Sequence, residues 1–115
     1  MPVIWSPHAA ELLDALITAL AREAGVDIAL KWEIRLRTEA DALGTLPLSR
    51  PVVPAGCFLT VPPNAENLRQ CICGAFRIVY EPTDTSVNIL SVRHYRQILR
   101  ATDTCWNDAP AFANE

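Results

Sequence analysis

Two consecutive segments with helical periodicity, separated by a single glycine, constrain the fold of this chain more than any other feature. Ser6 and Pro7 open the first segment, and both residue types suit the start of a helix. Serine caps free backbone N–H groups, and proline lacks the N–H group that the first helical position leaves unbonded. Apolar side chains then recur at a spacing of about 3.6 residues, at Leu13, Leu16, Ile17 and Leu20. We therefore predict a helix from about Pro7 to Ala24, with Gly25 as its stop.

The second segment follows almost at once and has one apolar stripe opposite a charged side. The stripe consists of Ala29, Trp32, Leu36 and Leu43. Gly44 stands where a helix stop is expected. Because so short a connection forces neighbouring helices to run antiparallel, the sequence predicts a helical hairpin.

A proline-rich segment separates this hairpin from three strand candidates. Residues 44–67 hold five of the nine prolines, and so long a segment in a small domain is either functional or an insertion. Within it, residues 57–61 alternate weakly and are a candidate for an extra short strand. Three further runs have the pattern of strands, with a turn rich in Pro, Asp and Thr between the last two, at residues 68–73, 75–80 and 86–93. Residues 3–5 form a candidate opening strand.

This order predicts an α+β domain in which the helical hairpin packs on one face of a small, mainly antiparallel sheet (β-α-α-β-β-β). We expect one domain over residues 1–101, with residues 44–67 as a long Pro-rich loop or insertion. Residues 102–115 are expected to form a short acidic tail.

Alternation along the strand at residues 75–80 divides its side chains between the two faces of the sheet. One set consists of Phe76, Ile78 and Tyr80, and the other of Arg77 and Val79. We expect the first set beneath the helices and Arg77 on an uncovered face.

The cysteines indicate neither a disulfide framework nor a metal site. There are four, too few and too unevenly spaced for a framework: Cys57, Cys71, Cys73 and Cys105. Cys71 and Cys73 share one face of a strand. A tetrahedral metal site would need two more ligands, typically a second closely spaced pair, whereas the remaining cysteines and both histidines are scattered. We expect free, mostly buried thiols and no metal.

The hydropathy pattern predicts a cytoplasmic protein that does not contact a membrane. No apolar run approaches the length that spans a bilayer. The N-terminal residues 1–14 have no basic region and no cleavage site of the kind that secretion signals carry.

The net charge of −3 conceals a segregation of charge along the chain. Residues 1–49 hold seven acidic and four basic side chains, and residues 101–115 hold three acidic and none basic. Between them, residues 67–100 hold five arginines against two acids. A basic patch within an acidic chain indicates a local anionic partner rather than general affinity for nucleic acid, although a solvated sheet face would give the same pattern.

Several local phrases in this order resemble the ParE/RelE family of bacterial type II toxins. They are VIWSPHAAELLDAL at the start, LPLSRP after the second helix, then LRQ, FRIVYE and ILSVRHYRQIL. Together they extend from Val3 to Leu99. The run Arg-His-Tyr-Arg-Gln at residues 93–97 is similar to the ending of many ParE members, so the ParE branch is the closer one.

The resemblance implies two different functions. ParE-like toxins bind and poison DNA gyrase, whereas RelE-like toxins enter the ribosome and cleave mRNA. Both belong to toxin–antitoxin modules that serve plasmid stabilisation, and both are neutralised in a complex with a cognate antitoxin. No cofactor is implied. A third alternative is a non-toxic domain of this fold that only binds an antitoxin.

The candidate site residues lie in two of the predicted strands and just beyond them. As target-binding residues the resemblance implies Arg77, Arg93, His94, Tyr95 and Arg96. For the nuclease alternative, a metal-independent mechanism would use Arg77 and Arg93 as phosphate clamps and His94 or Tyr95 as acid or base.

Three observations favour the gyrase binder over the nuclease. Lys31 is the single lysine of the chain, although RelE-like nucleases usually surround their site with lysines. The sequence pI of about 5.3 is unfavourable for docking into a ribosomal cavity, where affinity comes largely from phosphate neutralisation. A general base is also not clearly placed, and Glu66 is the nearest candidate. His94 and Tyr95 could also merely finish a strand.

Overall fold

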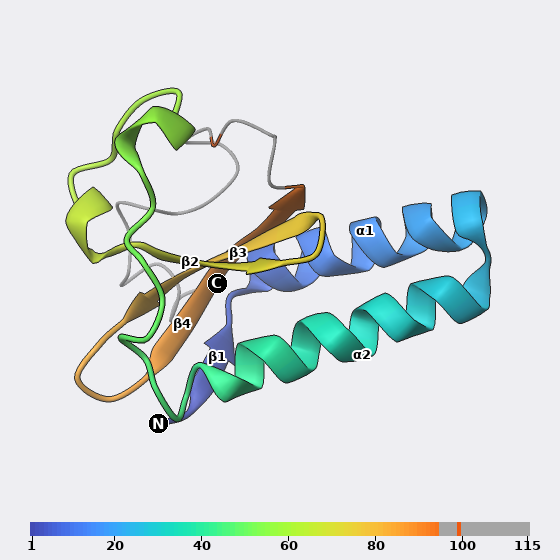
Figure 1. Cartoon of the computed structure of the whole chain (residues 1–115), viewed down its shortest axis with the longest axis horizontal. Coiled ribbons are helices and arrows are strands. Elements are labelled where there is room, and N and C mark those ends of the chain that lie inside the picture. The colour runs from blue at the N-terminus through green and yellow to red at the C-terminus, as the bar shows by residue number, and fades with distance from the viewer. Residues whose placement is uncertain (95–98, 100–115) are drawn as a thin grey trace.

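Two long helices and a four-stranded sheet make up the computed structural model of this chain, which describes residues 1–94 and 99 (Figure 1). The elements follow one another as β1 (Val3–Trp5), α1 (Pro7–Ala24), α2 (Val26–Ala42), β2 (Arg69–Cys73), β3 (Phe76–Pro82) and β4 (Val87–His94). Two single 3-10 turns, Ala55–Cys57 and Ala65–Asn67, interrupt the segment between α2 and β2. Tyr95, Arg96, Cys105 and the acidic tail predicted for residues 102–115 lie outside the described residues.

The first helix has the limits that its sequence predicts. The Ser6 hydroxyl accepts a hydrogen bond from the Ala9 N–H group at 2.9 Å, and Pro7 occupies the first helical position. Gly25, with φ of +98°, ends α1 and immediately precedes α2. A positive φ of this kind favours glycine, so this one residue reverses the chain and forms the predicted hairpin.

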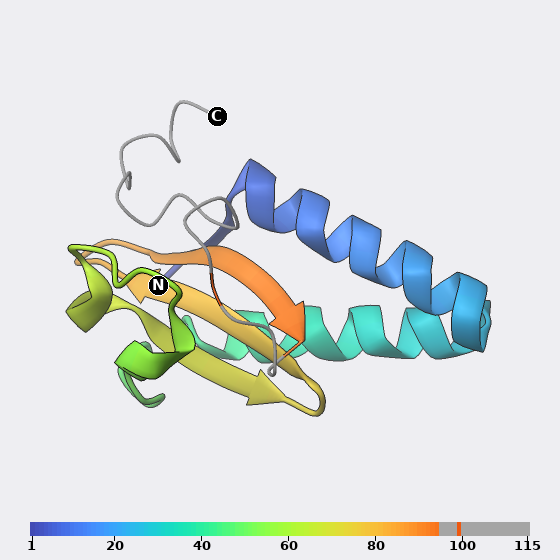
Figure 2. The same cartoon turned by 90° about the horizontal axis from the view of Figure 1, so that it is seen from above.

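The two helices of the hairpin diverge from each other over the sheet. The two helices converge at the turn that joins them and separate toward the sheet, beyond whose end they project (Figure 2). The second helix ends at Ala42, two residues before the predicted stop at Gly44. Gly44 is nonetheless needed there, because a β-carbon would overlap the Met1 carbonyl oxygen. The Met1 ammonium group donates a hydrogen bond to the Gly44 carbonyl oxygen at 2.9 Å.

The sheet has the order β1-β4-β3-β2 and is mainly antiparallel, as predicted. The exception is β1, which pairs parallel with the first half of β4, from Val3 opposite Val87 to Trp5 opposite Ile89. A bulge in β4 shifts the β3–β4 register between Val79 and Tyr80. The α+β class and the placement of the hairpin on one face are confirmed.

The helix-facing core contains the alternating residues that the sequence assigns to it. Ile78 and Tyr80 are fully buried, and Phe76 packs at the margin. They meet residues from both helices and from the other strands, among them Ala9, Leu13, Leu36, Ala40, Cys71, Cys73, Ile89 and Val92.

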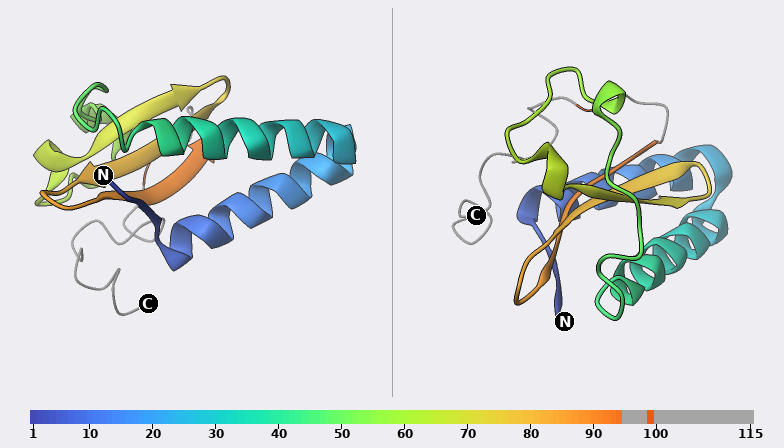
Figure 3. Two further views of the ribbon diagram at one scale, coloured as in Figure 1. Left: turned by 90° about the horizontal axis from the view of Figure 1, so that it is seen from below. Right: turned by 60° about the vertical axis from the view of Figure 1, so that its left-hand side comes forward.

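The opposite face of the sheet is not uncovered, and the expectation for Arg77 is therefore wrong. The proline-rich segment folds across this face, on the side away from the helices (right view of Figure 3). A second core forms beneath it, from Val53, Phe58, Leu68, Val79, Leu90 and Leu99. Arg77 consequently keeps only 6% of its surface exposed. The physical reason is that Val79 and Leu90 make this face too apolar to be left in water.

The proline-rich segment is attached to the sheet by side chains of β2 and β3. The buried Tyr80 hydroxyl donates a hydrogen bond to the Pro47 carbonyl oxygen at 2.8 Å. Arg69 donates one to the Arg50 carbonyl oxygen at 2.6 Å. The candidate strand at residues 57–61 is reduced to a single bridge between Phe58 and Leu99. In the described part of the chain, no helix has the length and apolarity needed to cross a membrane.

Candidate target-binding site

The sheet brings two of the five candidate residues directly together. Arg77 on β3 and Arg93 on β4 are register partners, so their side chains leave neighbouring strands on the same face of the sheet. Arg93 is half-buried, whereas Arg77 is nearly covered. Arg93 therefore offers more surface to a partner than Arg77 does.

His94 points to the other face, because side chains alternate along a strand. It is the register partner of Phe76, and the two rings meet edge to face with centroids 6.2 Å apart. Phe76 in turn meets Trp32 of α2 at 5.1 Å in the same geometry. The Arg35 guanidinium lies over the Trp32 ring, 5.0 Å from its centroid. This aromatic column fixes His94 against the helix-facing core.

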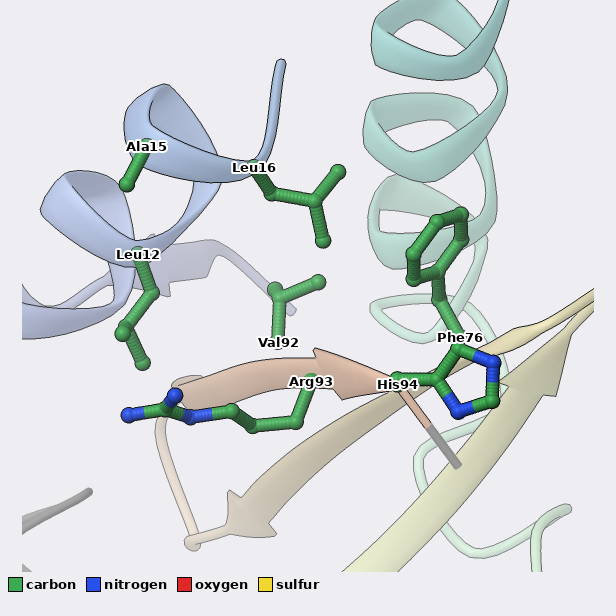
Figure 4. A pocket seen from close by; sticks show the side chains of 7 residues that line it. All are labelled: Leu12, Ala15, Leu16, Phe76, Val92, Arg93 and His94. Atoms are coloured by element: carbon green, nitrogen blue, oxygen red, sulfur yellow. The ribbon is translucent and has the colours of Figure 1, made fainter. Parts of the chain in front are cut away.

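A hollow of about 280 Å³ lies between α1 and the end of β4. Leu12 and Leu16 of α1 face Val92 and the stem of Arg93 across it, and Phe76 and His94 close its other end (Figure 4). Its complete lining is Leu12, Ala15, Leu16, Phe76, Val92, Arg93 and His94. The hollow thus combines an apolar floor with two basic side chains on its rim.

The five arginines of residues 67–100 separate into different roles. Arg69 holds the proline-rich segment through backbone carbonyl oxygens, and we assign it to the scaffold. Arg77 and Arg93 lie together at the end of the sheet where β4 finishes. Arg96 and Arg100 lie outside the described residues, as does Tyr95, so the site is described for three of its five candidates.

The nuclease alternative requires an acid or base and a phosphate clamp that converge on one phosphate. His94 and Arg77 lie on opposite faces of the sheet, and this arrangement does not favour that pair. Glu66, the candidate base, is an exposed residue of the second 3-10 turn.

The thiols are structural in the part of the chain that is described. Cys71 and Cys73 are buried in the helix-facing core, and Cys57, Cys71 and Cys73 are all free. The Cys71 thiol lies 3.9 Å from the Glu39 carboxylate. Burial raises the pKa of the Cys71 thiol above its ordinary value. Among residues 1–94 and 99, no group of three or more His, Cys, Asp or Glu side chains could hold a metal ion.

Two features of the site were not foreseen from the sequence. The column through Trp32 and Phe76 joins residues far apart in the chain, and only their aromatic character hinted at a contact. The hollow beside Leu12 and Ala15 lies between α1 and the end of β4, which are far apart in the chain. The signal available in the sequence was that the apolar residues Leu12 and Leu16 lie beside the buried side of α1.

Comparison with known proteins gives a family and similar solved structures. The family model described as "ParE toxin of type II toxin-antitoxin system, parDE" matches residues 3–99. A solved structure described as "Chromosomal ParDE TA system from P. aeruginosa" is similar with a TM-score of 0.64 and 19% identity, covering 82% of this chain and 95% of that chain. At this identity the likeness concerns the fold. No curated protein matches the chain.

Proposed function

This chain belongs to the ParE toxin family of type II toxin–antitoxin systems, and we propose that it binds and poisons DNA gyrase and is neutralised by a cognate antitoxin. We place this activity in the cytoplasm, where both partners would be met. Arg93 and His94 would make the exposed contacts to the target, and Arg77 would support Arg93 from the neighbouring strand.

The observation that carries this proposal is the composition of the surface at the end of β4. Arg93 and His94 border a hollow whose other five lining residues are apolar. Arginine next to aromatic and aliphatic surface is typical of contacts between proteins, from which lysine is depleted. A surface that grips nucleic acid would instead need several cations along a phosphate backbone.

The position of His94 also favours a binder over an enzyme. Its ring lies edge to face against Phe76, on the face of the sheet opposite Arg77 and Arg93. A nuclease that used Arg77 as phosphate clamp and His94 as general acid would have to bring one phosphate to both faces of the sheet at once. Tyr95 is the remaining candidate for that role, and it can be tested directly.

The proposal is tested by inducing the protein in a bacterial host while DNA and translation are followed. We expect filamentation, a DNA-damage response, and inhibition of gyrase supercoiling by the purified protein. A ribosome-dependent nuclease would instead stop translation first and cut mRNA at codons within ribosomes.

Tyr95→Phe separates the two mechanisms, because it keeps the ring and removes only the hydroxyl. A gyrase binder should be almost unaffected, whereas a nuclease that uses Tyr95 should lose about 100-fold or more of its rate. Cleavage of mRNA that collapses in Tyr95→Phe would overturn the proposal. A protein that binds its antitoxin and yet harms neither process would be the non-toxic domain.

A further inference from the structure

The first half of α2 carries an apolar stripe on a side of the helix that does not pack on the core. Val26, Leu30 and Ile34 stand four residues apart and therefore share this side. They keep 62%, 49% and 66% of their surface exposed. This part of the hairpin projects beyond the end of the sheet, so the described strands do not cover it (Figure 1). Isolated apolar side chains are common on surfaces, whereas a contiguous stripe indicates a contact.

One acidic and one basic side chain flank the stripe on the same side. Asp27 and Lys31 are both exposed, and each lies three residues before a member of the stripe. Neither forms an ion pair within the part of the chain that the structure describes. On the other flank, Glu33 and Arg37 already pair with each other at 3.3 Å. The charges available to a partner are therefore one acid and one base, side by side.

Such an arrangement is complementary to a second copy of itself. If two copies of α2 cross antiparallel about a two-fold axis at Leu30, this residue meets its own counterpart, and Val26 meets the partner's Ile34. Asp27 then lies opposite the partner's Lys31, and by symmetry Lys31 lies opposite the partner's Asp27. A partner with a single sign of charge would match only one of these two residues.

The spacing of the stripe also suits the commonest packing of two helices. Ridges of side chains at i and i+4 interdigitate at a crossing angle of about −50°, with the axes about 8–10 Å apart. From Val26 to Ile34 the stripe rises about 12 Å along the helix, and crossing helices touch only near their crossing point. So short a contact falls at the lower end of specific interfaces, about 1,200 Å² in total. The dimer should therefore dissociate in the micromolar range.

We propose that this stripe of α2 is the interface of a symmetric homodimer, with Leu30 at the two-fold axis and reciprocal ion pairs between Asp27 and Lys31. The inference goes beyond the proposed function and does not depend on it. The interface residues do not belong to the lining of the hollow at the end of β4. The dimer consequently presents two candidate target-binding sites at once, which favours a target with two matching surfaces.

The first test measures the mass of the purified full chain by sedimentation equilibrium, at concentrations from about 1 µM to about 1 mM. We expect the mass to rise from that of one chain to that of two. Leu30→Asp places a charge at the apolar axis and should raise the dissociation constant by about 100-fold or more. Thr38→Asp, at an exposed position of α2 outside the stripe, is the matched control and should change it by less than about threefold.

Exchange of the two charges tests the register of the helices. Lys31→Glu sets a carboxylate against the partner's Asp27 at both ends of the interface and should weaken dimerisation by about tenfold. The double variant Asp27→Lys with Lys31→Glu restores opposite charges and should recover the original constant within about threefold. A double variant as weak as Lys31→Glu alone would overturn the proposed interface.

Disulfide trapping locates the two-fold axis. Leu30→Cys sets two thiols against each other where the helices cross, close enough for a disulfide, so mild oxidation should link most of the protein into dimers. Thr38→Cys is the control, because the antiparallel crossing separates its two copies by about 24 Å along the helix. It should give no more linked dimer than the native chain, whose own free cysteines set the background.

Two outcomes would overturn the inference. One is a chain that stays monomeric at concentrations up to about 1 mM. The other is a dimer that Leu30→Asp leaves intact, because a different surface would then form it. Inhibition of gyrase is measured separately, so failure of the dimer leaves the proposed function standing, and failure of that function leaves the dimer standing.

Discussion

The indole ring of Trp32 covers Gly74 so closely that a β-carbon at Gly74 would overlap it. Gly74 forms the turn between β2 and β3 with φ of +61°, a conformation in which glycine is favoured. The same ring supports Phe76, and Phe76 supports His94. The tightness of one turn thus helps to position a residue of the candidate site on another strand.

Gly74→Ala should therefore lower the free energy of unfolding by about 2 kcal/mol or more. It combines the strain of a positive φ at a non-glycine residue with displacement of the Trp32 ring. Gly56→Ala is the matched control, since a β-carbon there has no neighbour within 4 Å, and it should change stability by less than about 0.5 kcal/mol. Urea denaturation followed by tryptophan fluorescence measures both. Equal midpoints for the two variants would contradict the contact.

Tyr80→Phe should loosen the proline-rich segment from the sheet. The variant removes the hydrogen bond to the Pro47 carbonyl oxygen and leaves that oxygen without its donor, at a cost of about 1–3 kcal/mol. We expect faster cleavage near residues 44–52 in limited proteolysis, together with a lower urea midpoint. Ser49→Ala, which removes an exposed hydroxyl, is the control. An unchanged cleavage rate in Tyr80→Phe would show that other contacts hold the segment.

Stability should fall in alkaline solution. Burial raises the pKa of Cys71 and Cys73 above their ordinary value of 9.0 and that of Tyr80 above 10.0. The folded protein then binds these protons more tightly than the unfolded chain, so the stability is fully present below about pH 9 and is lost as the pH rises further. Urea midpoints at a series of pH values measure this loss. Cys71→Val should reduce its slope, whereas Cys57→Ser should not.

The three described cysteines should differ in reactivity toward an alkylating reagent. Cys57 is partly exposed, whereas Cys71 and Cys73 are at most 1% exposed. In native protein, Cys57 should be modified at least about tenfold faster than either of the others, because the reagent must reach the sulfur. In denaturant the rates should become similar. Fast native modification of Cys71 would mean that β2 opens readily from the helix-facing core.

Loss of Arg93 should weaken the action on the target. Arg93→Ala should raise the concentration that half-inhibits gyrase supercoiling by about tenfold, since an arginine at the centre of a contact is worth more than 1 kcal/mol. Arg93→Lys keeps the charge but not the planar fork, and should recover only part of the effect. Arg22→Ala removes an exposed charge at the far end of α1 and serves as the control. Equal inhibition by Arg93→Ala and Arg22→Ala would remove Arg93 from the site.

Elements with local signals could be placed from the amino-acid sequence. The cap at Ser6, the proline at the next position and the stop at Gly25 fixed α1 to the residue, because each acts within one turn of the helix. Alternation likewise assigned Phe76, Ile78 and Tyr80 to the helix-facing core. It also placed Arg77 on the other face of the sheet, but it did not predict that Arg77 is buried there.

Contacts between distant residues could not be placed in this way, because they depend on how the whole chain packs. Three features join residues that are far apart in the chain. Strand β1 pairs parallel with β4, and residues 44–67 cover Val79 and Leu90. The β3–β4 register places Arg77 beside Arg93. The physical reason is that burial of apolar surface is not directional. The apolar residues of one strand indicate that a face of the sheet must be covered. Which segment covers that face depends on the packing of the whole chain.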